Sequence, residues 1–74
     1  MVSSWWVTPR ELDVLRLLVR GQSNREIAAS LGIGETTVKW HLANIQDRFH
    51  SPNRTDIAVK AIKWKLVRPS GRPM

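Results

Sequence analysis

Cysteine is absent from this sequence of 74 residues, which excludes disulfide bonds and thiolate metal ligands within it. The absence suits a reducing compartment, and we expect a cytoplasmic protein. Long hydrophobic runs are also missing, since none approaches the roughly 20 residues that a membrane-spanning helix needs. The sequence shows no charged start followed by an apolar stretch, which is the pattern of a signal peptide. We therefore predict no membrane-embedded partner.

Acidic residues are scarce. Six Asp and Glu stand against twelve Lys and Arg, which gives a formal net charge of +6. Such an excess favours an anionic partner, with nucleic acid first and an anionic membrane surface second. A chain of this length permits one domain with a small core, and it needs good packing or a partner for stability.

Catalytic and metal-binding patterns are missing as well. Neither histidine, His41 or His50, has Cys, Asp or Glu at metal-ligand spacing, and we expect His41 to be a packed side chain. The only glycine-rich string, at Gly32 and Gly34, lacks the lysine of a phosphate-binding loop. We predict no enzyme, no cofactor and no metal site.

Two helices joined by a tight turn are predicted for residues 23–49. Ser23 and Glu26 form a capping-box pair, so a helix should begin at Asn24. Gly32 follows this helix at the position where a left-handed residue ends a helix at little cost. A second helix is predicted for residues 35–49.

The spacing of small residues inside this stretch is that of a helix-turn-helix. Ala28 precedes the turn glycine Gly32 by four residues, which lets the second helix cross closely over the first. Apolar residues that would hold the crossing angle are Ile27, Leu31, Ile33 and Val38. This spacing leaves two interpretations open, a DNA-binding helix-turn-helix and an ordinary αα-hairpin.

A helix is also predicted before this stretch. Thr8 is its N-cap, Pro9 its first residue, and Glu11 completes a capping box; the helix should run to about Arg20, with Gly21 ending it. Its core face consists of Val14, Leu15 and Leu18. Glu11 either pairs with Arg54 across the fold, or both remain solvated.

The fourth predicted helix covers residues 56–66 and has two apolar sides. One is Ala58, Ile62 and Leu66, and the other is Ile57, Ala61 and Trp64. Since one small core can use only one side, the other is a reason to expect a partner. We expect weak self-association through Ile57, Ala61 and Trp64. The lysines of this helix, Lys60, Lys63 and Lys65, are expected to be solvated.

The sequence from about residue 7 to residue 67 resembles the LuxR/GerE-type helix-turn-helix domain. That family's pattern is roughly L-T-x-R-E, S-N-x-E-I-A, I-S-x-x-T-V-K-x-H and N-R. The matching residues are Thr8, Arg10, Glu11, Ser23, Asn24, Glu26, Ile27, Ala28, Thr37, Val38, Lys39, His41, Asn53 and Arg54. The resemblance implies an all-α, four-helix, bundle-like DNA-binding domain of a bacterial transcription regulator, dimeric through its last helix.

One side of the third helix is the expected recognition face. At about 100° per residue, its core side is Val38, Leu42, Ile45 and Phe49. The opposite side supplies the candidates for base contacts in the major groove, which are Thr36, Lys39, Trp40 and Ala43. The candidates for DNA backbone contacts are Ser23, Asn24, Thr37 and Arg54. Trp40 either contacts a base edge or lies along the protein surface.

Three of the departures from the family's pattern flank the third predicted helix. Gly34 replaces a serine N-cap, which costs only a few tenths of a kcal/mol. His50 replaces a glycine after the third helix, where a left-handed conformation is expected. Ser51 replaces an apolar residue, so we expect a looser corner there.

The ends of the chain fall outside the domain that we predict for residues 8–67. Residues 1–7 form an N-terminal tail whose Trp5 and Trp6 either cover the core or dock a partner protein or domain. Residues 68–74 should form a disordered basic tail.

Two alternatives to a sequence-specific DNA-binding regulator stay open. One is a protein-interaction module that keeps the fold without operator recognition, which the paired tryptophans and Gly34 favour. The other is a promoter-binding domain like region four of a bacterial sigma factor, against which the T-V-K-x-H and N-R residues argue.

Overall fold

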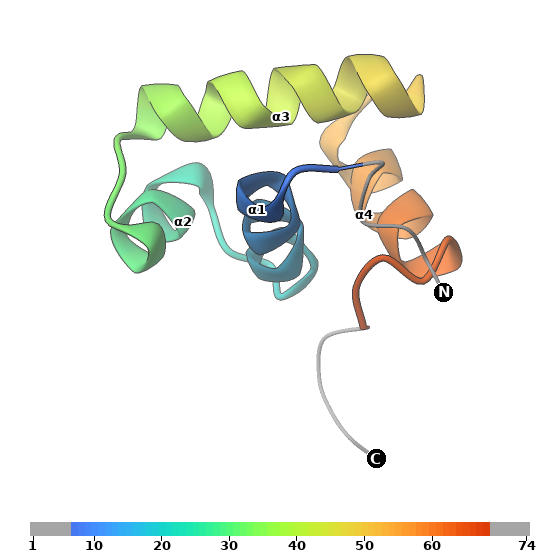
Figure 1. Cartoon of the computed structure of the whole chain (residues 1–74), viewed down its shortest axis with the longest axis horizontal. Coiled ribbons are helices and arrows are strands. Elements are labelled where there is room, and N and C mark those ends of the chain that lie inside the picture. Colours follow the sequence, from blue (N-terminus) through green and yellow to red (C-terminus); the bar gives the residue numbers. More distant parts are fainter. Residues whose placement is uncertain (1–6, 69–74) are drawn as a thin grey trace.

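The computed structural model describes residues 7–68, and within that range it contains four α-helices and no strand. They are α1 (Pro9–Val19), α2 (Asn24–Leu31), α3 (Glu35–Phe49) and α4 (Arg54–Lys63), shown in Figure 1. This confirms the all-α prediction. Trp5, Trp6 and the basic tail from position 69 onward lie outside the described residues.

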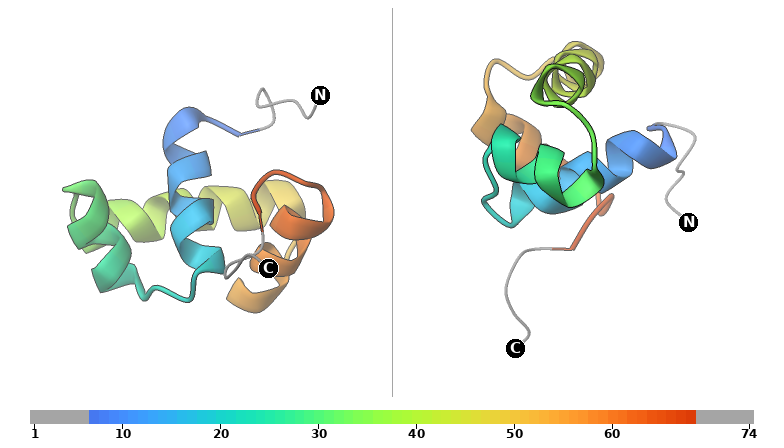
Figure 2. Two further views of the ribbon diagram at one scale, coloured as in Figure 1. Left: turned by 90° about the horizontal axis from the view of Figure 1, so that it is seen from below. Right: turned by 90° about the vertical axis from the view of Figure 1, so that its left-hand side faces the viewer.

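The long helix α3 lies across one side of the other three helices and packs against each of them (Figures 1 and 2). Helix α1 crosses beneath the middle of α3, with α2 at one end and α4 at the other. The side of α3 that faces away from α1, α2 and α4 is therefore left uncovered by the described part of the chain.

Local capping explains where the first two helices begin and end. The Thr8 and Ser23 side chains accept hydrogen bonds from the backbone N–H groups of Glu11 and Glu26. The carboxylates of Glu11 and Glu26 in turn accept hydrogen bonds from the backbone N–H groups of Thr8 and Ser23. These are the two predicted capping boxes. Gly32 ends α2 at a φ of 69°, a left-handed conformation that glycine adopts without strain.

The third helix, α3, has the predicted bounds. Gly34 and His50, two of the residues that depart from the family's pattern, stand at its two ends. Gly34 provides no side-chain cap. His50 has a φ of 53°, so a histidine occupies the left-handed position that the pattern assigns to glycine. This backbone conformation carries a modest cost for a non-glycine residue.

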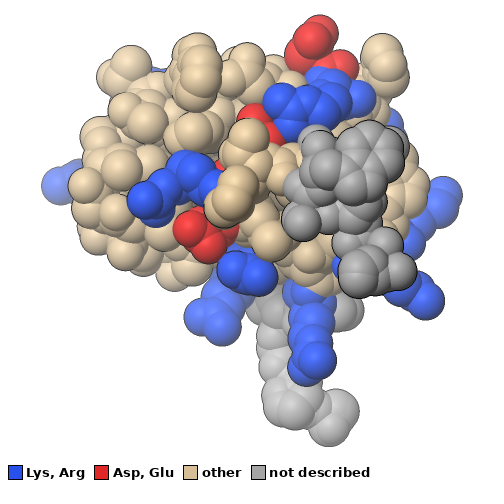
Figure 3. All heavy atoms as spheres, viewed as in Figure 1, with Lys and Arg blue, Asp and Glu red and all other residues tan. Residues whose placement is uncertain are grey.

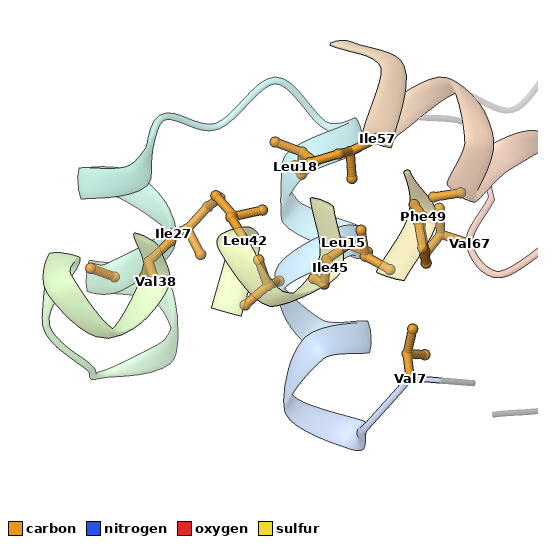
Figure 4. Packing of buried hydrophobic residues seen from close by; sticks show 13 residues of the cluster. Val7, Leu15, Leu18, Ile27, Val38, Leu42, Ile45, Phe49, Ile57 and Val67 are labelled. Carbon is orange, nitrogen blue, oxygen red and sulfur yellow. The ribbon is translucent and has the colours of Figure 1, made fainter. Parts of the chain in front are cut away.

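One hydrophobic core joins all four helices (Figure 4). Its largest fully buried side chains are Phe49, Leu15, Ile27, Ile45, Ile57, Val14 and Val38. Val7 closes the core beside α1 and is 3% exposed. Burying each of the larger side chains contributes about 1.5–3 kcal/mol, and together these contributions offset the conformational entropy of a short chain.

An ion pair between α1 and α3 differs from the expected one. The Glu11 carboxylate is 3% exposed and accepts two hydrogen bonds from the Arg48 guanidinium, with Nη2–Oε2 at 3.1 Å. Neither alternative holds for Glu11, which is buried and pairs with Arg48 instead of Arg54, because the packing of α1 against α3 brings Arg48 to it.

The surroundings of Glu11 stabilise its charged form. Burial alone would raise its pKa, but the hydrogen bonds from Arg48 and from the Thr8 backbone, with the nearby charges of Arg48 and His41, outweigh burial. The pKa of Glu11 is therefore lowered from its ordinary value. The same pairing raises the pKa of Arg48.

The fourth helix begins two residues earlier and ends three residues earlier than predicted. Asn53 is its N-cap and accepts from the Asp56 backbone N–H at 2.8 Å. At the other end Lys65 has a φ of 60°, and the Leu66 N–H turns back to the Ala61 carbonyl. These bonds satisfy the last carbonyls of α4 as a left-handed turn does.

Part of the side of α4 that was expected to form the dimer contact is buried in the domain's own core. Ile57 and Ala61, placed on the dimer surface from sequence, are 1% and 0% exposed in the domain's own core. Trp64 packs its ring edge-on against Phe49, with ring centres 5.0 Å apart. Ile57 and Ala61 therefore cannot contact a second copy without leaving the core, whereas Trp64 is only partly buried. The side of α4 that carries Ala58, Val59 and Ile62, which we call its outer side, retains more exposure to solvent.

The corner between α3 and α4 is closed rather than loose. Ser51 is 6% exposed, and Lys60 Nζ donates to the backbone oxygens of Phe49 and His50 at 3.0 and 3.2 Å. Lys60 also forms an ion pair with Asp56 at 2.9 Å, and this pairing lowers the pKa of Asp56. Lys60 is thus a structural residue and not part of a solvated charge run.

Candidate nucleic-acid interface

Helices α2 and α3 cross closely around the predicted turn. Ala28 is 6% exposed and packs in the core between the two helices, and its carbonyl accepts the Ile33 N–H at 3.0 Å. A larger side chain at position 28 would push α3 away. The geometry is that of a helix-turn-helix, in which the second helix is presented outward.

All four side chains expected to contact bases are exposed on the uncovered side of α3. They are Thr36, Lys39, Trp40 and Ala43. Trp40 is 61% exposed, so it does not fold back fully onto the protein surface. The four thus form a solvent-facing strip along the N-terminal two-thirds of α3, which we call the groove face.

The expected backbone contacts lie beside this strip. Ser23 and Arg54 are exposed at the starts of α2 and α4, Asn24 is half-buried, and Thr37 is exposed in the first turn of α3. Because Gly34 offers no side-chain cap, the α3 N-terminus also keeps backbone N–H groups without a capping acceptor. Such groups favour an anion through hydrogen bonding and the helix dipole.

Arg54 connects the N-termini of α2 and α4. Its Nη1 donates to Asn24 Oδ1 at 2.6 Å, and its Nη2 donates to the Gln22 carbonyl at 2.7 Å. With its oxygen occupied by Arg54, Asn24 presents its amide N–H groups as the remaining donors. Arg54 therefore acts on this surface in part as a positioning residue for Asn24, a role that spacing along the chain does not reveal.

A shallow hollow of about 200 Å³ links the groove face to these helix starts. Its lining includes Lys39, Ala43, Asn24, Arg54 and Gln46. Sequence reasoning missed Gln46, although it lies two turns after Lys39 on the same side of α3 and could have been found from that spacing. Its amide adds a donor and an acceptor to the strip.

Basic side chains outnumber acidic ones among the charged residues of the chain. Lys and Arg outnumber Asp and Glu on the face drawn in Figure 3. The acidic groups include Glu11 and Asp56, and these two are neutralised by Arg48 and Lys60. The net charge of +6 is therefore left to the rest of the surface, where it attracts polyanions.

Two other classes of site are absent from residues 7–68. Within this range no helix is long and apolar enough to cross a membrane. No group of three or more His, Asp or Glu side chains in the same range could hold a metal ion.

Comparison with known proteins gives a consistent set of relatives. The family described as bacterial regulatory proteins of the luxR family matches residues 6–61. The chain is 45% identical over 60 residues to an uncharacterized transcriptional regulatory protein, YhcZ, of Bacillus subtilis, which covers 81% of the chain and 28% of that relative. It is 44% identical over 64 residues to the transcriptional regulatory protein DegU of Brevibacillus brevis, covering 84% of the chain and 27% of the relative.

A third relative is more distant. The response regulator protein VraR of Staphylococcus aureus is 36% identical over 62 residues, covering 84% of the chain and 30% of the relative. The chain thus spans less than a third of the length of these curated relatives.

Proposed function

Because the chain belongs to the luxR family of bacterial regulatory proteins, we propose that it binds duplex DNA sequence-specifically and regulates transcription in the bacterial cytoplasm. The observation that carries this proposal is the groove face, an exposed polar and aromatic strip on a helix that the rest of the fold holds outward. The relatives named as transcriptional regulators support the same role.

The groove face fits the major groove of B-DNA, which is wide enough to admit an α-helix. Lys39 is placed to donate to guanine O6 and N7 or to a phosphate, and Thr36 has a hydroxyl that can serve either a base or the backbone. Ala43 offers only a methyl contact. With α3 in the groove, the starts of α2 and α4 lie along the DNA backbone, where Ser23, Asn24 and Arg54 are positioned for phosphates.

We also propose that two copies pair through the outer side of α4. Val59 is 53% exposed there, and Ala58 and Ile62 are only half-buried, so this side retains apolar area. A pair related by a two-fold axis would bring the same residues together and space two groove faces for two half-sites. The patch is small, so pairing should be weak in solution and firmer on DNA.

Selection from random duplex DNA followed by sequencing tests the proposed function directly. An enriched site with two-fold symmetry is the expected result, and its half-site should span the positions that α3 faces. Binding to all duplexes alike, with no enriched sequence, would instead favour the protein-interaction module that keeps this fold without operator recognition.

Replacing Lys39 by alanine should weaken binding to the selected site by about 1–3 kcal/mol, because a base-reading lysine is lost from the middle of the groove face. Titration of labelled duplexes measures this, with the selected and a scrambled sequence compared at several salt concentrations. If Lys39 contacts only phosphate, both sequences should lose affinity alike, and the salt slope should fall by about one. Unchanged affinity at every salt concentration would remove Lys39 from the interface.

Replacing Asn24 by alanine should weaken binding to specific and scrambled duplexes in parallel, by about 1–2 kcal/mol, since phosphates carry no sequence. Arg54→Lys is the matched variant, because it keeps the charge but cannot serve both Asn24 and the Gln22 carbonyl. It should weaken binding less in the Asn24→Ala background than in the wild type. A loss confined to one base position would place the start of α2 away from the backbone.

A further inference from the structure

Trp40 is the most exposed large hydrophobic side chain among the described residues, at 61%. It lies in the groove face between Lys39 and Ala43, on a helix whose other large apolar residues are all buried. An indole in water leaves a large apolar area unused, and such exposure on a small basic domain marks a contact surface.

The exposed indole has an aromatic neighbour within its own helix. Its ring meets the His41 imidazole edge-on, with ring centres 5.2 Å apart and planes inclined at 62°. His41 is itself half-buried, and its Nδ1 is enclosed by the protein. This contact restricts the orientations open to Trp40, so less side-chain entropy is lost when the ring meets a ligand.

The chemistry of the major groove limits what an indole can recognise there. The ring has one N–H donor and no acceptor, and its remaining edge is apolar. The bases expose polar donors and acceptors in that groove, together with one apolar group, the C5-methyl of thymine. Cytosine presents the same ring position without a methyl group, unless it is methylated at C5.

We propose that Trp40 is a specificity-determining residue that binds the C5-methyl group of a pyrimidine, which is thymine or a 5-methylcytosine in its place. The inference rests on the proposed DNA binding and names the ligand chemistry of one position in the groove face. Lys39 beside it, and the net charge of +6, favour DNA over an apolar protein surface as the occupant.

The size of the effect follows from the group that is buried. Enclosing one methyl group between the indole and the neighbouring base removes about one CH₂ equivalent of apolar area from water. Removing that methyl group should therefore weaken binding by about three- to tenfold. Methylating a cytosine at the same position should strengthen binding by a similar factor.

The test uses the duplex obtained by selection and replaces each thymidine of one half-site in turn by deoxyuridine, which lacks only the methyl group. The wild-type chain should lose about three- to tenfold in affinity at one position that faces α3. Trp40→Ala should bind more weakly and show no further loss at that position. When that position carries cytosine, methylating the cytosine at C5 should restore affinity for the wild type. The same methylation should leave the affinity of Trp40→Ala unchanged.

Ala29→Ser provides the control, since Ala29 is an exposed apolar residue of α2 outside the groove face. This variant should keep the full uracil effect. Trp40→Ala should also melt within a few degrees of the wild type, because the ring is largely exposed.

Two results would overturn the inference while leaving the proposed function intact. One is a selected half-site in which uracil is tolerated at every position by the wild type. The other is a uracil effect that persists undiminished in Trp40→Ala. Failure to bind any duplex would overturn the proposed function together with the inference.

Discussion

Val59→Glu is expected to leave the domain folded and to reduce cooperative binding to an operator with two half-sites by about 100-fold or more. Val59 is 53% exposed on the outer side of α4, so a carboxylate there meets water in the single copy. In a two-fold pair the same carboxylate would face its own copy across the axis and repel it. Losing the pair removes the effective concentration that links the two half-sites, which accounts for the size of the effect.

Titration of duplexes with one and with two half-sites measures this loss. Affinity for the single half-site should change little, and Val59→Lys, with the opposite charge, should lose cooperativity in the same way. A Val59→Glu chain that still binds two half-sites cooperatively would place the dimer contact elsewhere.

Trp64→Glu is the contrasting variant on the inner side of α4. Its ring packs against Phe49, so a carboxylate at this position would lose that contact and lie partly in the core. We expect a cost of about 3 kcal/mol and extensive unfolding, seen as a fall in helical circular dichroism. A folded Trp64→Glu chain would argue against the packing described for this helix.

Glu11→Ala is expected to lower the free energy of unfolding at neutral pH by about 2–3 kcal/mol, a large part of the stability of so small a domain. The substitution breaks the ion pair with Arg48 and the capping box with Thr8. Arg48 is 41% exposed in this pair, which places the cost below that of a fully buried one. Thermal melting should show a shift of about 10–20 °C.

The effect of Glu11 should depend on pH in a defined direction. Its pKa is lowered in the folded state, so its contribution is fully present above the ordinary value of 4.5 and is lost as the pH falls below that value. The melting temperatures of the wild type and Glu11→Gln should therefore converge at acid pH. A difference that stays constant from neutral to acid pH would show that the charge of Glu11 contributes nothing.

Substitution of the two candidate arginines separates the observed pairing from the expected one. Arg48→Ala should destabilise the chain much as Glu11→Ala does, and the double variant should lose little more. Arg54→Ala should add its own small effect to that of Glu11→Ala, since Arg54 bonds to Asn24 and Gln22.

The bounds of the first three helices could be predicted because their signals are local. Each capping box joins residues three apart, and Gly32 satisfies a backbone conformation that depends on one residue. The groove face was predictable for the same reason, since the 100° step of a helix assigns its sides once the core residues are known. The end of α4 was less predictable, because Lys65 adopts a left-handed conformation that glycine usually marks.

Tertiary structure alone decided which distant residues meet. Glu11 is 37 positions from Arg48, and whether it reaches Arg48 or Arg54 depends on the angle at which α3 crosses α1. The same holds for α4, whose two apolar sides look alike in sequence until packing against α1 and α3 buries Ile57 and Ala61. The sequence by itself thus determined the helices, the turn and the family, because these depend on residues within a few positions of one another. The partner of each charged group and the free side of α4 depend on how the helices pack, which no local pattern encodes.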